Sequence, residues 1–538
     1  MAQTRNQSRL LSVINDAYDR FQGNDAQLMN IEAGQAVGEA IRTTLGPKGM
    51  DKMLVDSKGG VIITNDGVSI IRDMDIDHPA AKMISEVAYT QEGEASDGTT
   101  TAVVVAGALL EQAQHLLEDD IHPTSIVNGY RIASRDAQVV LEDYATKIDT
   151  NDTEILTDLA KTAMNGSEAE QHKHFLSKLV VEAVEQVSAN GVVDTDAIQV
   201  ESINGGVVSD SECLMGAVIE KQPATVEMPT VRTDASIAVL DGGIESKDPS
   251  VKGTISFSDH ETVQDILARE EANYLAAVET LDELDVNVLF AGEDIADMAI
   301  DDLTRRDVLA FDNVSGNDLE RVTNAAGATI CSDVDSLAEV SLGSAGHIEV
   351  GVNEWRDVVF VEECADPDNV TLLLRGGTTH VMDERERVVA DAIGVVSSAV
   401  EDGKICPGGT AMDIEIIRHL QRTAEGVGTR EQLAMEAYAD AIEVLPRTIA
   451  ETAGLDPIDT LVELRHAHDT GNIQVGIDAE TGNIENMSQK GIIEPIRVKR
   501  AAFEAATQSA VQLLQVDDIL LSEQLPDERQ GVEDNLPR

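Results

Sequence analysis

The sequence predicts a multidomain protein in which a mainly helical domain, formed by both ends of the chain, carries an α/β unit between its halves. The chain has 538 residues, too many for one hydrophobic core, so two or three domains are expected. Residues 25–145 and 405–520 are rich in alanine and have the apolar periodicity of helices. Between them, apolar runs typical of strands alternate with helical stretches, which favours an inserted α/β unit.

The helical pattern is clearest in RVKRAAFEAATQSAVQLLQVDDIL, residues 497–520. Small and apolar side chains recur there at helical spacing, at Ala502, Ala505, Ala506, Ser509, Leu513 and Val516. This spacing places them on one face, which is expected to pack against other helices. The strand-like runs of the middle part are residues 236–244, 286–293, 327–334, 357–364 and 370–377.

The composition excludes several classes of partner. Lys and Arg number 39 and Asp and Glu 99, so the net charge is −60, and such a surface repels nucleic acid and anionic lipid. The hydrophobic residues, 42% of the chain, fall in periodic segments, which predicts a folded protein with an acidic surface. A salt-rich cytoplasm, that of a halophile, fits this charge, because at about 1 M salt the Debye length is roughly 3 Å.

The cysteines and the amino terminus predict a cytoplasmic location. Cys213, Cys331, Cys364 and Cys406 lie far apart and form no CxxC pair, so neither a disulfide framework nor a zinc site is expected. The first residues lack the sustained apolar core of a signal peptide. No apolar run approaches the roughly 18 residues of a membrane span. We therefore expect a soluble protein of the reducing cytosol.

The stretch EASDGTTTAVVVAGALL, residues 94–110, begins a helix that is apolar all round and therefore buried. The first turn of any helix leaves backbone N–H groups unpaired. One interpretation is that Ser96 or Asp97 caps the helix. The other is a phosphate cradle, in which Gly98 allows close backbone approach and the threonines donate hydrogen bonds. Asp97 would then hold Mg²⁺, which commonly binds one or two carboxylates and phosphate oxygens.

A wider comparison of motifs favours the phosphate cradle. Residues 43–71, TTLGPKGMDKMLVDSKGGVIITNDGVSII, predict a helix, a Gly-Pro turn and a strand pair with NDG at its hinge. Together with DGTTTAVVVAG they resemble the nucleotide site of the group II chaperonins, the family of the archaeal thermosome and the eukaryotic cytosolic chaperonin. Further segments agree in order and spacing over about residues 25–520: 372–396, 401–420, 437–465, 476–487 and 491–510.

The resemblance implies a chaperonin fold of three domains. These are a mainly α equatorial ATP-binding domain from residues 1–148 and 403–538, a small α+β intermediate hinge domain from 149–217 and 368–402, and an α/β apical domain from 218–367 that binds substrate. A helical lid protrusion is expected near 245–275. The implied function is that of an ATPase whose Mg-ATP hydrolysis closes a double-ring chamber around non-native proteins. Clients, ring size and homomeric or heteromeric assembly stay open.

The site residues implied by the resemblance are assigned position by position. The expected nucleotide contacts are Leu45, Gly46, Pro47, Gly98, Thr99, Thr100, Thr101, Gly408, Gly409, Asp478, Ala479 and Glu494. Asp97 is the expected Mg²⁺ ligand. Asp391 is the expected carboxylate that orients or deprotonates the attacking water, assisted by Asp66.

Each of these residues also has a plain structural interpretation. Asp66 lies in an ordinary NDG turn signal, and Gly408 and Gly409 can be loop glycines. Glu494 precedes a proline and can simply start a helix. Asp391 can be a solvated acid, because it flanks an apolar stripe. That stripe consists of Val388, Val389, Ala392, Val395 and Val396.

Three departures from the family pattern leave the rate of hydrolysis open. Ser96 and Thr410 stand where the family usually has glycine, and Ser167 stands where it has a lysine thought to reach the terminal phosphate. Lys161, or a monovalent cation such as K⁺, is a candidate substitute. The alternative function is therefore a weakly hydrolysing, mainly structural subunit of a hetero-oligomeric ring. A small-molecule kinase has little support, since no acceptor motif is visible.

Overall fold

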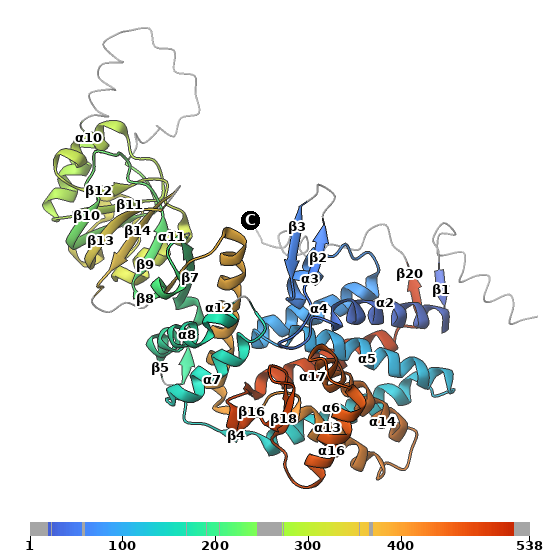
Figure 1. Ribbon diagram of the computed structural model, residues 1–538. Helices are drawn as coiled ribbons and strands as arrows, with labels where there is room; N and C mark the ends of the chain where they lie inside the picture. The colour runs from blue at the N-terminus through green and yellow to red at the C-terminus, as the bar shows by residue number, and fades with distance from the viewer. Residues whose placement is uncertain are drawn as a thin grey trace, which may run out of the picture. The chain divides into compact units, whose positions relative to one another are not determined.

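The computed structural model describes residues 20–22, 24–55, 60–167, 169–189, 191–203, 205–244, 272, 274–353, 356–364 and 369–520. The chain divides into two compact units. We call Met1–Lys147 with Lys404–Arg538 the helical unit and Ile148–Gly403 the inserted unit. The first joins both ends of the chain, as Figure 1 shows by its blue and red helices.

The helical unit contains two groups of helices. From the first half of the chain come α2 (Asn24–Arg42), α3 (Gly67–Asp73), α4 (Pro79–Ala95), α5 (Thr99–Glu118) and α6 (Pro123–Tyr144). From the second half come α13 (Ala411–Ala424), α14 (Glu431–Ile442), α15 (Val444–Thr452), α16 (Pro457–Asp469) and α17 (Ile496–Leu514).

Helix α5 lies at the centre of this unit, packed by α2, α4, α14 and α17. Its residues 102–110 are all buried, which confirms the prediction of a buried helix. The backbones of α2 and α5 approach closely because two glycines face each other, and a Cβ on Gly38 would lie 3.2 Å from Cα of Gly107. The predicted apolar face of α17 is buried at Ala502, Ala505, Ala506 and Leu513, whereas Ser509 is half-buried and Val516 lies beyond the helix end.

The helical unit also contains short strands. They pair as β1 (Arg20–Gln22) with β20 (Asp518–Leu520), β2 (Lys52–Val55) with β3 (Val61–Thr64), and β17 (Val475–Asp478) with β18 (Asn483–Asn486). A three-stranded sheet has the order β19 (Ile493–Pro495), β16 (Lys404–Pro407), β4 (Thr146–Lys147).

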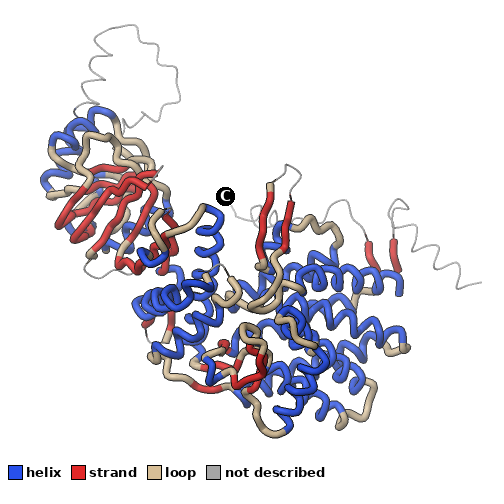
Figure 2. The backbone as a smooth tube through the Cα atoms, viewed as in Figure 1, coloured by secondary structure: helices blue, strands red, loops and turns tan. Residues whose placement is uncertain are grey.

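The inserted unit is built on a six-stranded sheet, drawn as the large group of red strands in Figure 2. Its order is β12 (Leu309–Phe311), β11 (Val288–Ala291), β10 (Val231–Leu240), β13 (Gly343–Asn353), β14 (Arg356–Glu362), β9 (Ala217–Glu220). Strands β10 to β12 are parallel and the other pairs antiparallel. Helices α10 (Asp297–Arg305) and α11 (Gly316–Ala326) and helical residues 274–283 accompany it. Phe290 and Phe311 stack in its core at 4.8 Å.

A smaller α+β part completes the inserted unit. Its sheet has the order β7 (Ile198–Ile203), β15 (Val370–Arg375), β8 (Glu212–Met215), and a short hairpin pairs β5 (Ser188–Ala189) with β6 (Val192–Val193). Helices α7 (Thr153–Ala163), α8 (Lys173–Val187) and α12 (Thr379–Asp402) pack together beside it. A mixed α/β multidomain fold was predicted, and the described residues have one.

Two local predictions are wrong. Residues 327–334 form no strand, because only Cys331 bridges to Leu240 before the chain turns into a short 3-10 helix. The NDG segment joins no strands either, since the β2–β3 connection is residues 56–60. Instead Asp66 is the N-cap of α3, and its Oδ2 accepts a hydrogen bond from the Ser69 amide at 2.8 Å. The helix N-terminus therefore uses the aspartate that the turn pattern assigned to a hairpin.

The remaining predictions concern strands, lid and membrane. Strands β10, β11, β14 and β15 confirm the runs near 236–244, 286–293, 357–364 and 370–377. The predicted lid near 245–275 lies outside the described residues, except for 272, 274 and 275. Within the described part of the chain no helix has the length and hydropathy needed to cross a bilayer.

Candidate nucleotide-binding site

The start of α5 is an open helix N-terminus. Gly98 is its N-cap with φ of 76°, and no side chain in the described residues caps this helix. Ser96 instead ends α4 in a left-handed conformation, and Oδ1 of Asp97 accepts only from the Gly98 amide, at 2.5 Å. The interpretation of Ser96 or Asp97 as a cap is therefore wrong. In the half-exposed first turn, Thr99–Thr101, the backbone N–H groups have no intrahelical acceptor and can donate hydrogen bonds to an anion.

Gly98 is required by its surroundings as well as by its φ. A Cβ there would lie 2.8 Å from Cγ1 of Val498 and 3.1 Å from Nε2 of Gln91. The buried Gln91 amide donates both to the Asp97 carbonyl at 2.7 Å and to the Val498 carbonyl at 3.0 Å. These bonds fasten the loop to α17, so its backbone geometry is fixed before any ligand arrives.

Two carboxylates lie beside this N-terminus. Gly67 packs against Thr100 so closely that a Cβ would lie 2.4 Å from its Oγ1, which brings the Asp66 cap to the start of α5. Burial raises the pKa of Asp97, and the Asp66 charge raises it further, whereas the Gly98 amide and Lys499 lower it. A divalent cation would relieve this repulsion, so the oxygen donors fit Mg²⁺. Among the described residues no three His, Cys, Asp or Glu converge on a metal geometry, so phosphate oxygens would have to complete the shell.

A charge cluster of the buried Asp413 and Lys499 and the half-buried Glu494 lies under the site. Lys499 Nζ is 2.8 Å from Asp413 Oδ2 and 3.8 Å from Glu494 Oε2. Burial opposes the charge on Lys499, but both acids outweigh it and raise its pKa. Burial also raises the pKa of Glu494 to about 7, with Asp413 and Asp97 adding to the shift and Lys499 opposing it. The lysine thus holds several acids together beneath the proposed phosphate position.

Sequence reasoning missed Lys499 and Asp413. The available signal was a lysine on the apolar face of α17, since Lys499 shares that face with Ala502, Phe503 and Ala506. A charged residue at a core position needs a partner. Nothing in the local sequence identifies Asp413 as that partner, because it comes from a different helix.

The two glycines before α13 form a close backbone contact. A Cβ on Gly408 would lie 3.0 Å from Glu494 Oε1, and one on Gly409 would lie 2.7 Å from the Ile477 carbonyl. The Ile477 amide donates to the Gly409 carbonyl at 2.8 Å. Gly408 and Gly409 therefore meet the β17–β18 hairpin, and Glu494 lies beside Gly408.

The β17–β18 hairpin also contacts the loop after α2, which contains Leu45, Gly46 and Pro47. Oδ1 of the buried Asp478 accepts from the amides of Glu480 and Thr481, so this side chain caps its own turn. Burial raises its pKa, but Thr481, the Glu480 amide and Lys490 outweigh burial and lower it. Ala479 beside it is buried. Lys48 donates to the Glu480 carbonyl at 3.1 Å.

The loop of Leu45, Gly46 and Pro47 is held from the other side by α15. The Thr452 hydroxyl donates to the Leu45 carbonyl at 3.4 Å, and Gly46, at φ of 85°, packs on Ile449. Contacts thus link the predicted nucleotide residues of the helical unit, from Leu45 through Asp478 and Gly408 to Asp97 and Asp66.

Asp391 belongs to the inserted unit. The five apolar residues of its helix stripe are buried, as predicted, while the Asp391 side chain is about one-third exposed. Its Oδ2 lies 3.1 Å from Nη1 of Arg387, which also binds Glu384. The flank position of Asp391 on α12 is confirmed, and its chemical role stays a prediction.

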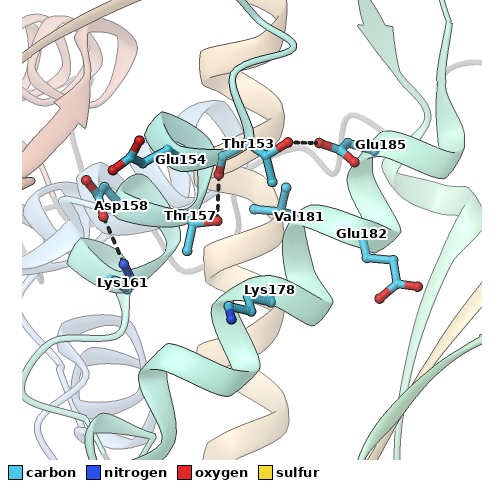
Figure 3. A pocket seen from close by; sticks show the side chains of 9 residues that line it. All are labelled: Thr153, Glu154, Thr157, Asp158, Lys161, Lys178, Val181, Glu182 and Glu185. Atoms are coloured by element: carbon cyan, nitrogen blue, oxygen red, sulfur yellow. Dashed lines mark hydrogen bonds and ion pairs between the residues drawn. The ribbon is translucent and has the colours of Figure 1, made fainter.

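Lys161 also lies in the inserted unit, in a cavity of about 440 Å³ between α7 and α8. Figure 3 shows its ammonium directed at Asp158, 2.9 Å away. The Ser167 hydroxyl donates to the Met164 carbonyl at 2.6 Å and so closes the turn after α7. Lys161 therefore already has a carboxylate partner, which weakens its candidacy as a phosphate ligand.

Comparison with known proteins identifies the family. A model of the TCP-1/cpn60 chaperonin family matches residues 37–524. The chain is 45% identical to thermosome subunit 1 of Haloferax volcanii over 538 residues, which cover 99% of this chain and 96% of that protein. It is 46% identical to a thermosome subunit of Methanopyrus kandleri (98% and 97% covered) and 46% identical to thermosome subunit alpha of Halobacterium salinarum (97% and 93% covered). These matches confirm the predicted ATPase activity and the predicted function in protein folding. The chain belongs to the TCP-1/cpn60 chaperonin family.

Proposed function

We propose that this chain is a thermosome-type subunit that binds Mg-ATP at the start of α5 and couples its hydrolysis to enclosure of non-native proteins. The observation that carries the proposal is the uncapped N-terminus of α5 with Asp97 and Asp66 beside it. An anion at that position gains the exposed amides of Thr99–Thr101 and the positive end of the helix dipole. Mg²⁺, when bound, would neutralise charge on the phosphates.

We assign the helical unit as the equatorial domain. Its division from the inserted unit, after Lys147 and before Lys404, supports the proposed boundaries of residues 1–148 and 403–538. The smaller α+β part corresponds to the proposed intermediate domain, residues 149–217 and 368–402. The six-stranded sheet corresponds to the proposed apical domain, residues 218–367, which would hold the client protein.

Different residues of the helical unit would contact different parts of the nucleotide. The loop of Leu45–Pro47, Gly408 and Gly409, and the turn of Asp478 and Ala479 are proposed around the nucleoside. Because the Asp478 carboxylate caps its own turn, the backbone of this turn is the better candidate for a ligand contact. Glu494 would act beneath the site through Lys499 rather than as a strong ligand, since its pKa of about 7 keeps it partly protonated at neutral pH.

Asp391 is proposed as the carboxylate that orients or deprotonates the attacking water. Phosphoryl transfer depends mainly on positioning and charge neutralisation, so a correctly delivered carboxylate is enough for this role. Because Asp391 belongs to the inserted unit, its action would depend on a hinge motion, which makes hydrolysis conditional on closure. Asp66 would assist, and K⁺ is a candidate for the charge that the missing lysine supplies elsewhere in the family.

Assembly into rings is supported by an apolar hairpin. Met53, Val55, Val61, Ile62 and Ile63 of β2 and β3 are all about half or more exposed. An exposed apolar hairpin with free edges marks a protein contact. We propose that it contacts another subunit. Whether the rings are homomeric and how many subunits they hold are not decided by this surface.

The charge of −60 supports an origin in the salt-rich cytoplasm of a halophile. Screening at high salt would remove most of the repulsion between like-charged subunits. The same charge accounts for the proposed absence of nucleic acid and lipid partners.

A turnover assay on the assembled protein tests the catalytic proposal. Asp391→Ala should lower kcat at least about 100-fold, the usual loss when an acid–base group is removed. Asp383→Ala, an exposed aspartate on the same helix, is the matched control and should leave kcat unchanged. Equal turnover in the two variants would refute the role of Asp391.

The second candidate function is a weakly hydrolysing, mainly structural subunit. It is favoured by Thr410, whose backbone is held in a left-handed conformation beside Gly409, and by Ser167, whose hydroxyl donates within its own turn. Wild-type turnover that is negligible until a second type of subunit is added would favour this alternative.

A further inference from the structure

His468 connects two parts of the helical unit that carry proposed nucleoside contacts. It lies in the last turn of α16 and is 1% exposed. Its Nδ1 is 2.6 Å from Oε1 of Glu415 on α13, and its Nε2 is 2.7 Å from the carbonyl oxygen of Val475 at the start of β17. Helices α13 and α16 and the hairpin strand β18 can be followed in Figure 1.

The geometry fixes which ring nitrogen of His468 faces each partner. A carbonyl oxygen can only accept a hydrogen bond, so Nε2 of His468 must carry hydrogen. Glu415 also accepts from Nη1 of Arg418 at 2.5 Å. Burial raises the pKa of Glu415, but His468 and Arg418 outweigh burial and lower it, so Glu415 is an ionised acceptor. His468 therefore joins the Glu415 carboxylate on one side of the ring to the Val475 carbonyl on the other.

These two bonds hold β17 against the start of α13. Glu415 lies in the second turn of the helix that follows Gly408 and Gly409. Val475 begins the strand that ends at Asp478. A second link between this strand and the glycines is the hydrogen bond from the Ile477 amide to the Gly409 carbonyl at 2.8 Å. Without His468, the Val475 end of the strand would lose its buried donor.

We propose that His468 is a positioning residue for nucleotide binding, whose two hydrogen bonds set β17 and therefore the turn of Asp478 and Ala479 relative to Gly408 and Gly409. The inference rests on the proposed nucleoside contacts of those residues. It goes beyond them by assigning their alignment to a buried histidine that touches neither phosphate nor metal in the proposed site. The residue acts on the nucleoside end of the ligand.

The proposal has a specific kinetic consequence. The nucleoside is bound equally in the ground state and in the transition state, so a misplaced nucleoside wall raises KM and leaves kcat unchanged. The phosphate loop at Gly98–Thr101 is fastened separately, through Gln91 and Val498. A ligand with phosphates but no nucleoside should therefore bind as before.

The test compares His468→Gln with His466→Gln, the same substitution on an exposed position of the same helix. Steady-state ATP hydrolysis by the assembled protein gives KM and kcat, and Mg-tripolyphosphate serves as a competitive inhibitor without a nucleoside. For His468→Gln we expect KM for ATP to rise about tenfold, the equivalent of one charge-assisted hydrogen bond. The values of kcat and of the tripolyphosphate inhibition constant should stay within about twofold, and His466→Gln should match the wild type.

Two further variants make every outcome informative. If His468→Gln does not assemble in size-exclusion chromatography, Glu415→Gln replaces it, because this variant keeps the shape of the side chain and one acceptor oxygen. It should still raise KM about threefold, which corresponds to half of the free energy of that hydrogen bond. An unchanged KM in the variant that assembles, or a fall in kcat at constant KM, overturns the role of His468. Asp97→Ala tests the nucleotide site separately, because unchanged ATP hydrolysis in that variant would refute the site whatever His468 does.

Discussion

Replacing Thr410 by glycine should stabilise the helical unit. Thr410 is the N-cap of α13 with φ of 65°, a left-handed conformation that β-branched residues rarely adopt. Its side chain is 2% exposed, and its hydroxyl has no hydrogen-bond partner within the described residues. The position thus combines backbone strain with a buried, unsatisfied polar group.

The magnitude follows from four contributions. Relief of the left-handed strain gains about 1–2 kcal/mol, and removal of the buried, unsatisfied hydroxyl gains about 2 kcal/mol. Loss of the two buried side-chain carbons, Cβ and the methyl group, costs about 1.6 kcal/mol, and the extra freedom of glycine in the unfolded chain costs about 0.7 kcal/mol. The net expected gain is therefore about 1 kcal/mol. For a unit of this size that corresponds to a rise in Tm of roughly 2 °C.

Calorimetry at constant high salt should compare Thr410→Gly with Thr410→Ala. The alanine variant also removes the hydroxyl and the methyl but keeps a Cβ in the left-handed conformation, so the glycine variant should melt higher. The same comparison applies to Ser96, which has φ of 55° at the end of α4 and stands where the family usually has glycine. A glycine variant no more stable than its alanine counterpart would show that the backbone strain is absent.

Four other predictions concern the site and the assembly. Gly98→Ala should weaken ATP binding at least about tenfold in calorimetry, because φ of 76° and the 2.8 Å approach to Val498 exclude a Cβ, whereas Gly93→Ala, with open space around it, should not. Lys499→Met should lower the free energy of unfolding by about 3–5 kcal/mol, because it leaves the buried Asp413 unpaired, and adding Asp413→Asn should recover part of the loss. A Lys499→Met variant with an unchanged free energy of unfolding would disprove the buried pair. The Glu494 pKa of about 7 exceeds its ordinary 4.5, so the stability it contributes is complete below pH 4.5 and declines as pH rises to about 7; denaturation curves of Glu494→Gln should lack this decline. Lowering the salt concentration should dissociate the assembly because of its charge of −60, so intact particles in light scattering after desalting would contradict the electrostatic argument.

Sequence reasoning was strongest where a pattern is local. The buried α5, the apolar stripe beside Asp391 and four of the five strand runs follow from periodicity, which depends only on neighbouring residues. The NDG segment shows the limit, because the same three residues can turn a hairpin or cap a helix. Asp66 caps α3, and only the packing of Gly67 against Thr100 selects that outcome.

The residues that the sequence did not reveal act across distant segments. Lys499 and Asp413 are 86 positions apart, and His468 and Glu415 are 53 apart, yet each pair forms a buried hydrogen bond. Such partners are chosen by helix packing, since a buried charge must meet whichever opposite charge the neighbouring helix presents.

The amino-acid order alone predicted that both ends of the chain are mainly helical, where the apolar stripe beside Asp391 lies, and that DGTTT begins a buried helix. These features depend on spacing within a few turns. Folding decided that Ser96 and Thr410 take left-handed conformations, that Gln91 ties the loop before α5 to α17, and that a buried histidine joins α13 to β17. The reason is that a buried polar group needs a hydrogen-bond partner, and only the packing of the folded core decides which groups lie close enough to be that partner.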